Sequence, residues 1–483
     1  MRGEILRSGY LGKIFSKQNI LAVMSAAAFL LSAVSCGIVP QRIPDNIGLG
    51  HSSQPEESSA TDTDSSCAIP VFSEFESMED SSDDSSGESS SSEDGEKDQN
   101  EEPEEQDGND GNEEDGFKNP YITADQPAPA YAVVPNDASV KYLGRTELSD
   151  DILWCAMSGT GAEFEYTGKN LEITFCGDSS VGDYYNHRAR IGVFVNGERA
   201  VDQVISDHET TVAVIKAEEP ADYNVKVVKL SEVEMSTVGI KSVNIDENES
   251  LSPSQQRSRR IEFIGDSITC GYGIDDTNPN SGFSTSTEDI TKTYAYLAAQ
   301  RLDADYSIFA ISGYGVLSGW TSNPSQINSS PLIPKYYSTL GCGSSSFTGH
   351  ALPQDIQWDF GRFRPDAIVI NLGTNDSTYC RDDDDKLNAF TDAYVAFLKD
   401  IRANNPDAVI FCILGTCSQQ IWTQVDRAAI KYTEETGDPN VHSLLIDSGD
   451  SSYGYAASYH PSAASNSLMA DVLYEQIAQT MGW

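Results

Sequence analysis

The chain has 483 residues, more than one ordinary domain holds, and its formal net charge at pH 7 is −44. Residues 51–120 carry 24 acidic residues against 2 basic ones, so half of that charge lies in one segment. Such a chain lacks the clustered lysines and arginines that bind phosphate backbones, which excludes nucleic acid as an expected partner. The nine cysteines include no Cys-x-x-Cys pair, which argues against a zinc site and against a disulfide scaffold.

Residues 1–36 have the pattern of an export signal. Basic residues precede an apolar run from Ile20 to Val34, which is too short to be preferred as a membrane-spanning helix, and small residues follow it. The stretch Ala33-Val34-Ser35-Cys36 resembles a bacterial lipobox, although Ala33 stands where leucine is usual, and this resemblance implies lipidation of Cys36. We therefore expect an extracellular protein that is either anchored to the cell surface through Cys36 or simply secreted.

Residues 37–137 are rich in Ser, Asp, Glu, Gly and Pro. Such a segment buries too little apolar surface to offset its chain entropy, and its like charges repel. It is predicted to be a disordered linker that lets the folded part reach outward from the membrane. A long acidic tether also favours a monomer.

Residues 138–250 show short segments of alternating polarity that predict a small β-sandwich. The Asn196-Gly197 pair is a hairpin signal. Two interpretations stay open for this domain, a carbohydrate-binding jelly roll and a structural cap on the next domain. A disulfide between Cys155 and Cys176, which both lie in predicted strands, is also left open. The predicted strands are 161–166, 170–176, 189–195, 211–215 and 223–230, with a turn expected at 167–170.

Residues 258–483 alternate apolar strands with helices, which predicts a parallel sheet covered on both faces. In such sheets ligands bind outside the carboxyl ends of the strands. The predicted strands are 261–264, 306–311, 367–372, 409–414 and 443–446, and the predicted helices are about 294–302, 386–404, 420–435 and 462–481.

Polar residues follow several of these strands at their carboxyl ends. Ser267 comes after the first strand, Gly313 after the second, Asn375 after the third and His460 after the fifth. A serine nucleophile, a histidine base and N–H donors for an oxyanion are the parts that acyl transfer requires. Each of these residues taken alone could simply be a turn, cap or structural residue. Four such residues after successive strands, however, predict one catalytic site.

The motifs around these residues resemble those of the SGNH (GDSL-type) hydrolases. Ser267 lies in Gly-Asp-Ser-Ile-Thr, Asn375 in Gly-Thr-Asn-Asp and His460 in His-Pro, with Gly313 between the first two in order. The chain is most similar to family 2 carbohydrate esterases, which join a small N-terminal jelly roll to an SGNH domain. The stretches that carry this similarity are 261–273, 283–288, 358–360, 365–376 and 459–462.

The resemblance implies a three-layer α/β hydrolase domain with a flavodoxin-like parallel sheet behind a small all-β jelly roll. It implies a serine esterase that removes O-acetyl groups from plant polysaccharides such as xylan or mannan, with no metal or organic cofactor. Ser267 would be the nucleophile and His460 the base. The amides of Ser267 and Gly313 and the side chain of Asn375 would form the oxyanion hole.

One position departs from the usual SGNH pattern. Most members place an aspartate two or three residues before the histidine, but this chain has Ala457 and Ser458 there, and the nearest preceding acid is Asp450. The chain thereby resembles esterases of this family that orient the histidine with a backbone carbonyl. We predict a Ser-His dyad, because the imidazole needs its tautomer fixed more than it needs a full charge beside it.

The remaining features leave alternatives. Trp320 and Trp358 lie in long loops near the predicted rim, where they would either stack on a sugar ring or pack in the core. The acidic run 382–385 precedes a predicted helix, whose dipole explains it better than a metal does. Two other functions stay open: a lysophospholipase-type lipid esterase, and a carbohydrate-binding protein whose esterase site is secondary or idle.

Overall fold

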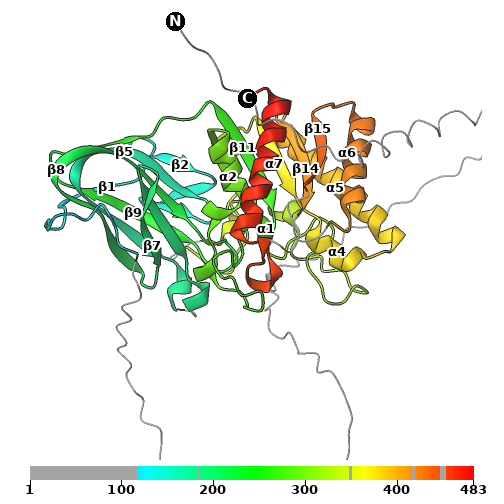
Figure 1. The fold of residues 1–483 in the computed structure, drawn as a ribbon, viewed down its shortest axis with the longest axis horizontal. Helices are drawn as coiled ribbons and strands as arrows, with labels where there is room; N and C mark the ends of the chain where they lie inside the picture. Colours follow the sequence, from blue (N-terminus) through cyan, green and yellow to red (C-terminus); the bar gives the residue numbers. More distant parts are fainter. Residues whose placement is uncertain (1–116, 183–184, 348–350, 416–418, 447–452) are drawn as a thin grey trace, which may run out of the picture. The chain divides into compact units, whose positions relative to one another are not determined.

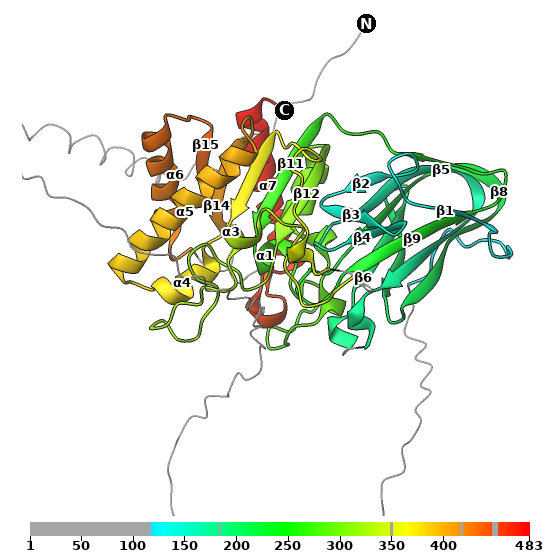
Figure 2. The same ribbon diagram turned by 180° about the vertical axis from the view of Figure 1, so that it is seen from behind.

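A computed structural model describes residues 117–483, except 183–184, 348–350, 416–418 and 447–452. The export signal with Cys36 and most of the predicted linker lie outside the described residues. The described part consists of an antiparallel β domain followed by an α/β domain (Figures 1 and 2). Within it, no helix combines the length and the apolar character needed to cross a membrane.

The β domain is built on one antiparallel sheet with the strand order β3-β4-β9-β5-β8-β6-β7, to which β1 adds on β9, and β2 and β10 add on β5. Its two longest strands, β5 and β8, pair with each other and run the length of the domain (Figure 1). Buried apolar side chains from these and neighbouring strands form the core of the domain. The strands are β1 (Tyr131–Val133), β2 (Lys141–Leu143), β3 (Thr146–Ser149), β4 (Ile152–Cys155), β5 (Gly161–Gly177), β6 (Arg190–Val195), β7 (Glu198–Val204), β8 (Glu209–Lys229), β9 (Val238–Ile245) and β10 (Ser250–Pro253).

The expected turn at 167–170 is wrong. The two segments that flank it form the single strand β5, and the register with β8 shifts between Gly168 and Asn170. The turn residues therefore make a β-bulge, which bends a strand without ending it. The Asn-Gly prediction is confirmed, since Asn196 (φ 51°) and Gly197 (φ 83°) form the tight connection between β6 and β7.

The β domain begins earlier than the boundary at 138. Strand β1 ends at Val133, and further upstream the backbone N–H of Thr123 donates to Lys216 O at 2.8 Å while Lys216 N–H donates to Tyr121 O at 3.0 Å. The side chain of Asn119 donates to Val214 O at 3.0 Å. The sheet therefore pairs the backbone at 121–124 and 131–133, so these residues belong to the domain and the linker expectation is wrong for them.

Cys155 and Cys176 do not form a disulfide. Both are free and buried. They lie in two different apolar clusters, Cys155 inside the β domain and Cys176 among residues of the α/β domain. Because the two thiols lie in different apolar clusters, they are not placed to form a disulfide with each other.

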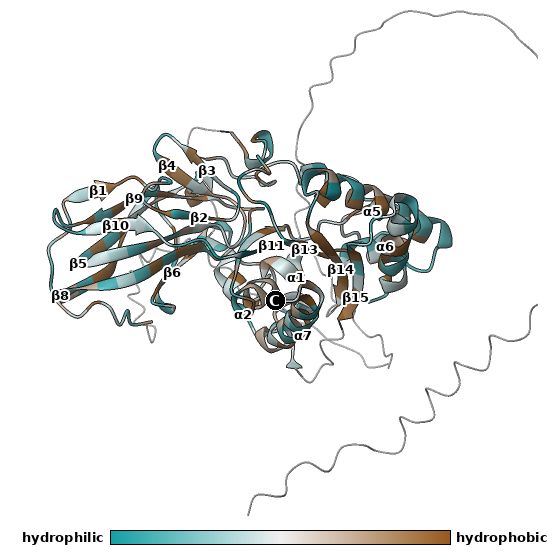
Figure 3. Ribbon diagram, turned by 90° about the horizontal axis from the view of Figure 1, so that it is seen from above, coloured by the Kyte–Doolittle hydropathy of each residue, from teal (hydrophilic) through white to brown (hydrophobic). Residues whose placement is uncertain are grey.

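The α/β domain has a five-stranded parallel sheet with the order β12-β11-β13-β14-β15, as its apolar runs predicted. Helices α2 and α7 cover one face and α5 and α6 the other, so the domain has three layers (Figure 3). The strands are β11 (Arg259–Gly265), β12 (Ala304–Ala310), β13 (Ala367–Asn371), β14 (Val409–Gly415) and β15 (Val441–Ile446), and the helices are α1 (Ser267–Cys270), α2 (Tyr294–Arg301), α3 (Ile333–Tyr336), α4 (Thr374–Cys380), α5 (Asp384–Asn404), α6 (Trp422–Thr436) and α7 (Ala463–Met481).

A buried arginine joins the two domains. Arg145, between β2 and β3, forms an ion pair with Glu262 of β11 at 2.9 Å, and the side chains involved are 0% and 4% exposed. Its guanidinium donates to Tyr337 O at 2.5 Å and lies over the rings of Phe309 and Trp358, 4.4 and 5.4 Å from their centroids. These contacts support the interpretation of the β domain as a structural cap on the α/β domain.

Candidate active site

Ser267 stands at a sharp corner between strand β11 and helix α1. The strand ends at Gly265, where an added Cβ would clash with the hydroxyl of Thr269. Asp266 caps the helix by accepting the Ile268 N–H at 3.1 Å, and Gly271 ends the helix in the left-handed region with φ 88°. The serine is therefore presented at the carboxyl edge of the sheet, where the sequence predicted it.

Gly313 lies on the loop that follows the neighbouring strand β12. Its φ of 75° is in the left-handed region that favours glycine. Its carbonyl accepts the backbone N–H of Trp320 at 2.9 Å. A small pocket opens beside it, lined by Ser312, Gly313, Trp320, Asn328 and Glu234.

Asp376 holds this loop in place. Its carboxylate accepts the backbone N–H groups of Val316, Leu317 and Ser318 at 3.0, 2.7 and 2.9 Å. Burial raises the pKa of Asp376 to about 6, although these hydrogen bonds act in the opposite direction. Asp376 is therefore a structural clamp of the loop that carries Gly313.

Asn375, in the first turn of α4, links the serine corner to the glycine loop. Its side-chain amide donates to Tyr314 O at 2.8 Å and to Asp266 Oδ2 at 3.2 Å. Burial raises the pKa of Asp266 to about 7, and the charge of Asp376 adds to the effect. The structure thus brings Ser267, Gly313 and Asn375 to the ends of three adjacent strands.

His460 follows a short turn of 3-10 helix at Ala457–Tyr459. Its Nδ1 lies 3.1 Å from the carbonyl oxygen of Ala457. A proton on Nδ1 satisfies that carbonyl and leaves Nε2 as the basic nitrogen. Burial lowers the pKa of His460 to about 4, although nearby carbonyls act in the opposite direction. Asp450, the nearest preceding acid in the sequence, lies outside the described residues.

The histidine turn is anchored to the serine corner. The ring of His460 stacks on Tyr272, with centroids 4.2 Å apart and planes at 21°, and the Tyr272 N–H donates to Ser267 O at 3.1 Å. Gly273 has φ 56°, and an added Cβ there would lie 2.5 Å from the Cβ of Ala457. The final glycine of the 261–273 stretch therefore leaves room for the turn that carries the histidine.

The two candidate tryptophans lie in different environments. Trp320 is half-buried and lines the pocket beside Gly313. Trp358 is only 7% exposed and packs in the core against the guanidinium groups of Arg145 and Arg362. Its ring lies against cations of the protein itself, which disfavours substrate binding by Trp358. This environment agrees with the alternative interpretation of Trp358 as a core residue.

The acidic run at 382–385 lies at the start of helix α5, where its dipole favours acids, and one of its residues also caps the helix. Asp383 accepts the N–H groups of Asp385 and Lys386, at 3.1 and 3.2 Å, at the start of α5. Among the residues that the structure describes, three side chains have ligand atoms close enough together to hold a metal: Glu232, Cys270 and Glu288, within 4.8 Å of one another. Burial raises the pKa of the Cys270 thiol well above its usual range, which disfavours the thiolate that a metal needs.

Sequence reasoning missed four acidic residues of the site. Asp266 directly precedes Ser267 and Asp376 directly follows Asn375, so their positions in the sequence could have indicated that they lie at the site. Glu232 and Glu234 come from the β domain, and Glu234 lines the pocket beside Gly313. Burial, with the charge of Glu232 adding, raises the pKa of Glu234 to about 8.

Two family models match the chain. Residues 263–468 match the GDSL-like lipase/acylhydrolase family, and residues 142–254 match the carbohydrate esterase 2 N-terminal domain. Each match covers one of the two domains described above.

Known proteins are similar over both domains. The chain is 29% identical over 356 residues to the cellulase/esterase CelE of Acetivibrio thermocellus, covering 72% of this chain but only 40% of CelE. It is 25% identical over 366 residues to an acetylxylan esterase / glucomannan deacetylase of Cellvibrio japonicus, covering 73% and 92% of the two chains. A family two carbohydrate esterase from Clostridium thermocellum, solved in complex with cellohexaose, aligns with a TM-score of 0.61 at 28% identity, covering 71% of this chain and 99% of that one.

Proposed function

Since this chain belongs to the GDSL-type hydrolases and carries the N-terminal domain of family 2 carbohydrate esterases, we propose that it removes O-acetyl groups from plant cell-wall polysaccharides such as xylan and glucomannan. The observation that carries the mechanism is the contact of His460 Nδ1 with the Ala457 carbonyl. This contact supports a Ser-His dyad in which a carbonyl, and not a carboxylate, fixes the tautomer.

In this mechanism the hydroxyl of Ser267 attacks the acetyl carbonyl while Nε2 of His460 takes its proton. The negative oxygen of the tetrahedral intermediate accepts hydrogen bonds from the amides of Ser267 and Gly313 and from the side chain of Asn375. The Asn375 hydrogen that now faces Asp266 is the one available to it. His460 then protonates the leaving sugar oxygen, and water releases acetate by the same steps. The scheme uses no metal or organic cofactor.

The pocket beside Gly313 is the proposed place of the acetyl group, with the sugar at its mouth. The half-buried ring of Trp320 offers an aromatic face, and Glu234 offers a carboxyl group that hydrogen-bonds to hydroxyls. Because the pocket is small, a short acyl group suits it better than a long chain.

The test is acetate release from acetylated xylan and glucomannan, measured beside hydrolysis of long-chain acyl esters. We expect wild type to release acetate and to ignore long chains, and Ser267→Ala to be inactive. Ser252→Ala, at an exposed position of β10, is the matched control and should behave as wild type. Activity on long chains alone would identify a lipid esterase. A folded protein that holds polysaccharide without cleaving any ester would be a carbohydrate-binding protein.

We further propose that residues 1–36 direct export, that Cys36 is lipidated, and that the acidic segment after it tethers a monomeric enzyme to the cell surface. The acidic composition of that segment supports the tether. Metabolic labelling with a radioactive fatty acid tests the anchor: wild type should be labelled and Cys36→Ala should not. Equal labelling of both would contradict it.

A further inference from the structure

The segment that follows β8 carries a glutamate from the β domain to the backbone of the α/β domain. Glu232 is 0% exposed, and its Oε2 accepts the N–H of Ser312 at 2.8 Å. Ser312 directly precedes Gly313. On either side of Glu232, Leu230 and Val233 are buried in two different apolar clusters of the α/β domain. The position of the carboxylate is therefore fixed by packing on both sides.

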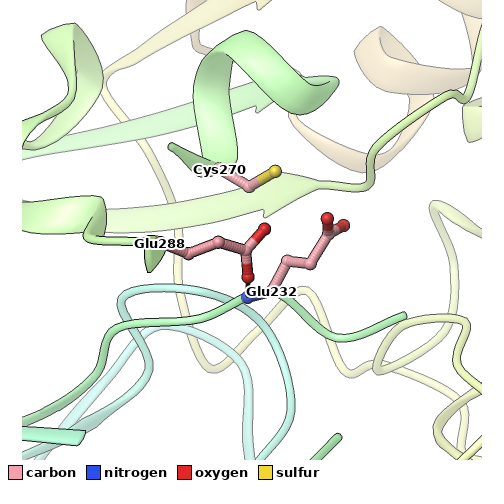
Figure 4. Close-up of side chains that lie close together, drawn as sticks. All are labelled: Glu232, Cys270 and Glu288. Carbon is pink, nitrogen blue, oxygen red and sulfur yellow. Dashed lines mark hydrogen bonds between the residues drawn. The ribbon is translucent and has the colours of Figure 1, made fainter. Parts of the chain in front are cut away.

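A second buried glutamate of the α/β domain returns the contact. Glu288, also 0% exposed, accepts the N–H of Glu232 on its Oε2 at 2.9 Å. Its backbone carbonyl accepts a hydrogen bond from the Arg190 guanidinium of β6 at 3.0 Å. Figure 4 shows Glu232 and Glu288 with the thiol of Cys270 beside them. The two domains are thus joined by reciprocal side-chain to backbone hydrogen bonds directly behind the Gly313 loop.

The cluster of Glu232, Glu288 and Cys270 is buried and carries two carboxyl groups. Burial, together with the charge of Glu232, raises the pKa of Glu288 well above its usual range. Lys229 donates to the carbonyls of Ser231 and Glu232 at 2.7 and 2.6 Å and supplies the compensating cation. The raised pKa of Glu288 and the nearby ammonium group of Lys229 both disfavour a divalent cation at this cluster.

Ser312 is held at two points. Its N–H donates to Glu232, and its hydroxyl lies 3.4 Å from the Sγ of Cys270. These contacts restrict rotation at Ser312, and that rotation sets the direction of the Gly313 N–H. We propose that Glu232 is a positioning residue of the oxyanion hole, through which the β domain completes the catalytic site. The inference rests on the proposed role of Gly313 in ester hydrolysis.

The experiment measures kcat and KM for p-nitrophenyl acetate, a small ester that reports on the oxyanion hole whatever the natural substrate is. Glu232→Ala should lower kcat about 10- to 100-fold with KM nearly unchanged, because the oxyanion needs the Gly313 amide only in the transition state. Glu232→Gln keeps an acceptor oxygen and should restore most of kcat. Glu163→Ala is the matched control. It removes a glutamate of the same domain that is 4% exposed and paired with Lys141, and kcat should not change.

Wild-type kcat in a folded Glu232→Ala variant would overturn the proposal. Equal loss in the alanine and glutamine variants, both folded, would also overturn it, since acceptance of the Ser312 N–H would then not be what matters. If Glu232→Ala does not fold, the Glu232→Asp variant tests the proposal in its place. Its carboxylate is one methylene too short to reach Ser312, so kcat should fall about tenfold, and an unchanged kcat would refute the idea.

A failure of this proposal for Glu232 can be distinguished from a failure of the proposed function. Failure of wild type on acetylated polysaccharide, with turnover of p-nitrophenyl acetate that Ser267→Ala abolishes, would refute the substrate and leave this test intact.

Discussion

Replacing Arg145 by alanine should be among the most damaging single changes in this protein. The side chain of Glu262 is only 4% exposed, and among the residues described Arg145 is the only cation that forms an ion pair with it. After the substitution, Glu262 keeps the hydroxyl of Tyr337 as a partner at 2.6 Å. The substitution also empties the space that the guanidinium fills against the rings of Phe309 and Trp358.

The expected loss of unfolding free energy is about 3–5 kcal/mol, which is the typical result of leaving one member of a buried ion pair unpaired. Arg145→Met combined with Glu262→Gln should lose less than Arg145→Ala alone, because the pair is then replaced without leaving a charge. Arg362→Ala is the matched control. Arg362 stacks on the same Trp358 from a position 33% exposed, and its loss should stay below about 1 kcal/mol.

Urea unfolding followed by tryptophan fluorescence measures these differences through the midpoint and the slope. A loss for Arg145→Ala no larger than that for Arg362→Ala would refute the reasoning. A double variant that loses as much as the sum of its two single changes would show that the two charged groups are not coupled.

Three further outcomes follow from the site. The base must be neutral to act, and burial lowers the pKa of His460 to about 4. We therefore expect kcat/KM for p-nitrophenyl acetate to stay level from pH 8 to about 5 and to fall as the pH drops through 4. A fall centred near pH 6.5, the usual pKa of histidine, would contradict this. Gly273→Ala, whose Cβ meets Ala457, should lower kcat about tenfold or more in a folded protein, whereas Gly182→Ala, which meets nothing within 4 Å, should not. Asp376→Ala leaves the N–H groups of 316–318 without their carboxylate and should reduce stability by about 2–4 kcal/mol in urea unfolding; a loss under about 0.5 kcal/mol would speak against the clamp.

Local sequence was sufficient where one segment decides its own structure. The parallel strands were predictable because runs such as 367–372 are apolar on both faces and stop at a glycine, and the site followed because parallel strands present their carboxyl ends at one edge. The contact of His460 with the Ala457 carbonyl agrees with the absence of a nearby aspartate from the sequence.

Contacts between distant segments explain what the sequence did not reveal. The stretch 167–170 has turn composition, yet pairing with β8 carries the strand through it as a bulge. Trp358 was expected near the rim of the sheet, because no residue near it in the sequence indicates that the guanidinium group of Arg145 lies over its ring. The role of Glu232 depends on Ser312, 80 residues away, and no local pattern reports such a pair.

Strand β12 is at one edge of the parallel sheet, yet all seven of its residues are buried. The β domain contacts it there, since Tyr306 of β12 donates its hydroxyl to Gly159 O at 3.0 Å. At the opposite edge, β15 carries Leu445, which is 46% exposed. An uncovered apolar edge strand pairs readily with other chains. A fragment without the β domain should therefore aggregate through β12, so the β domain also protects the hydrolase domain from self-association.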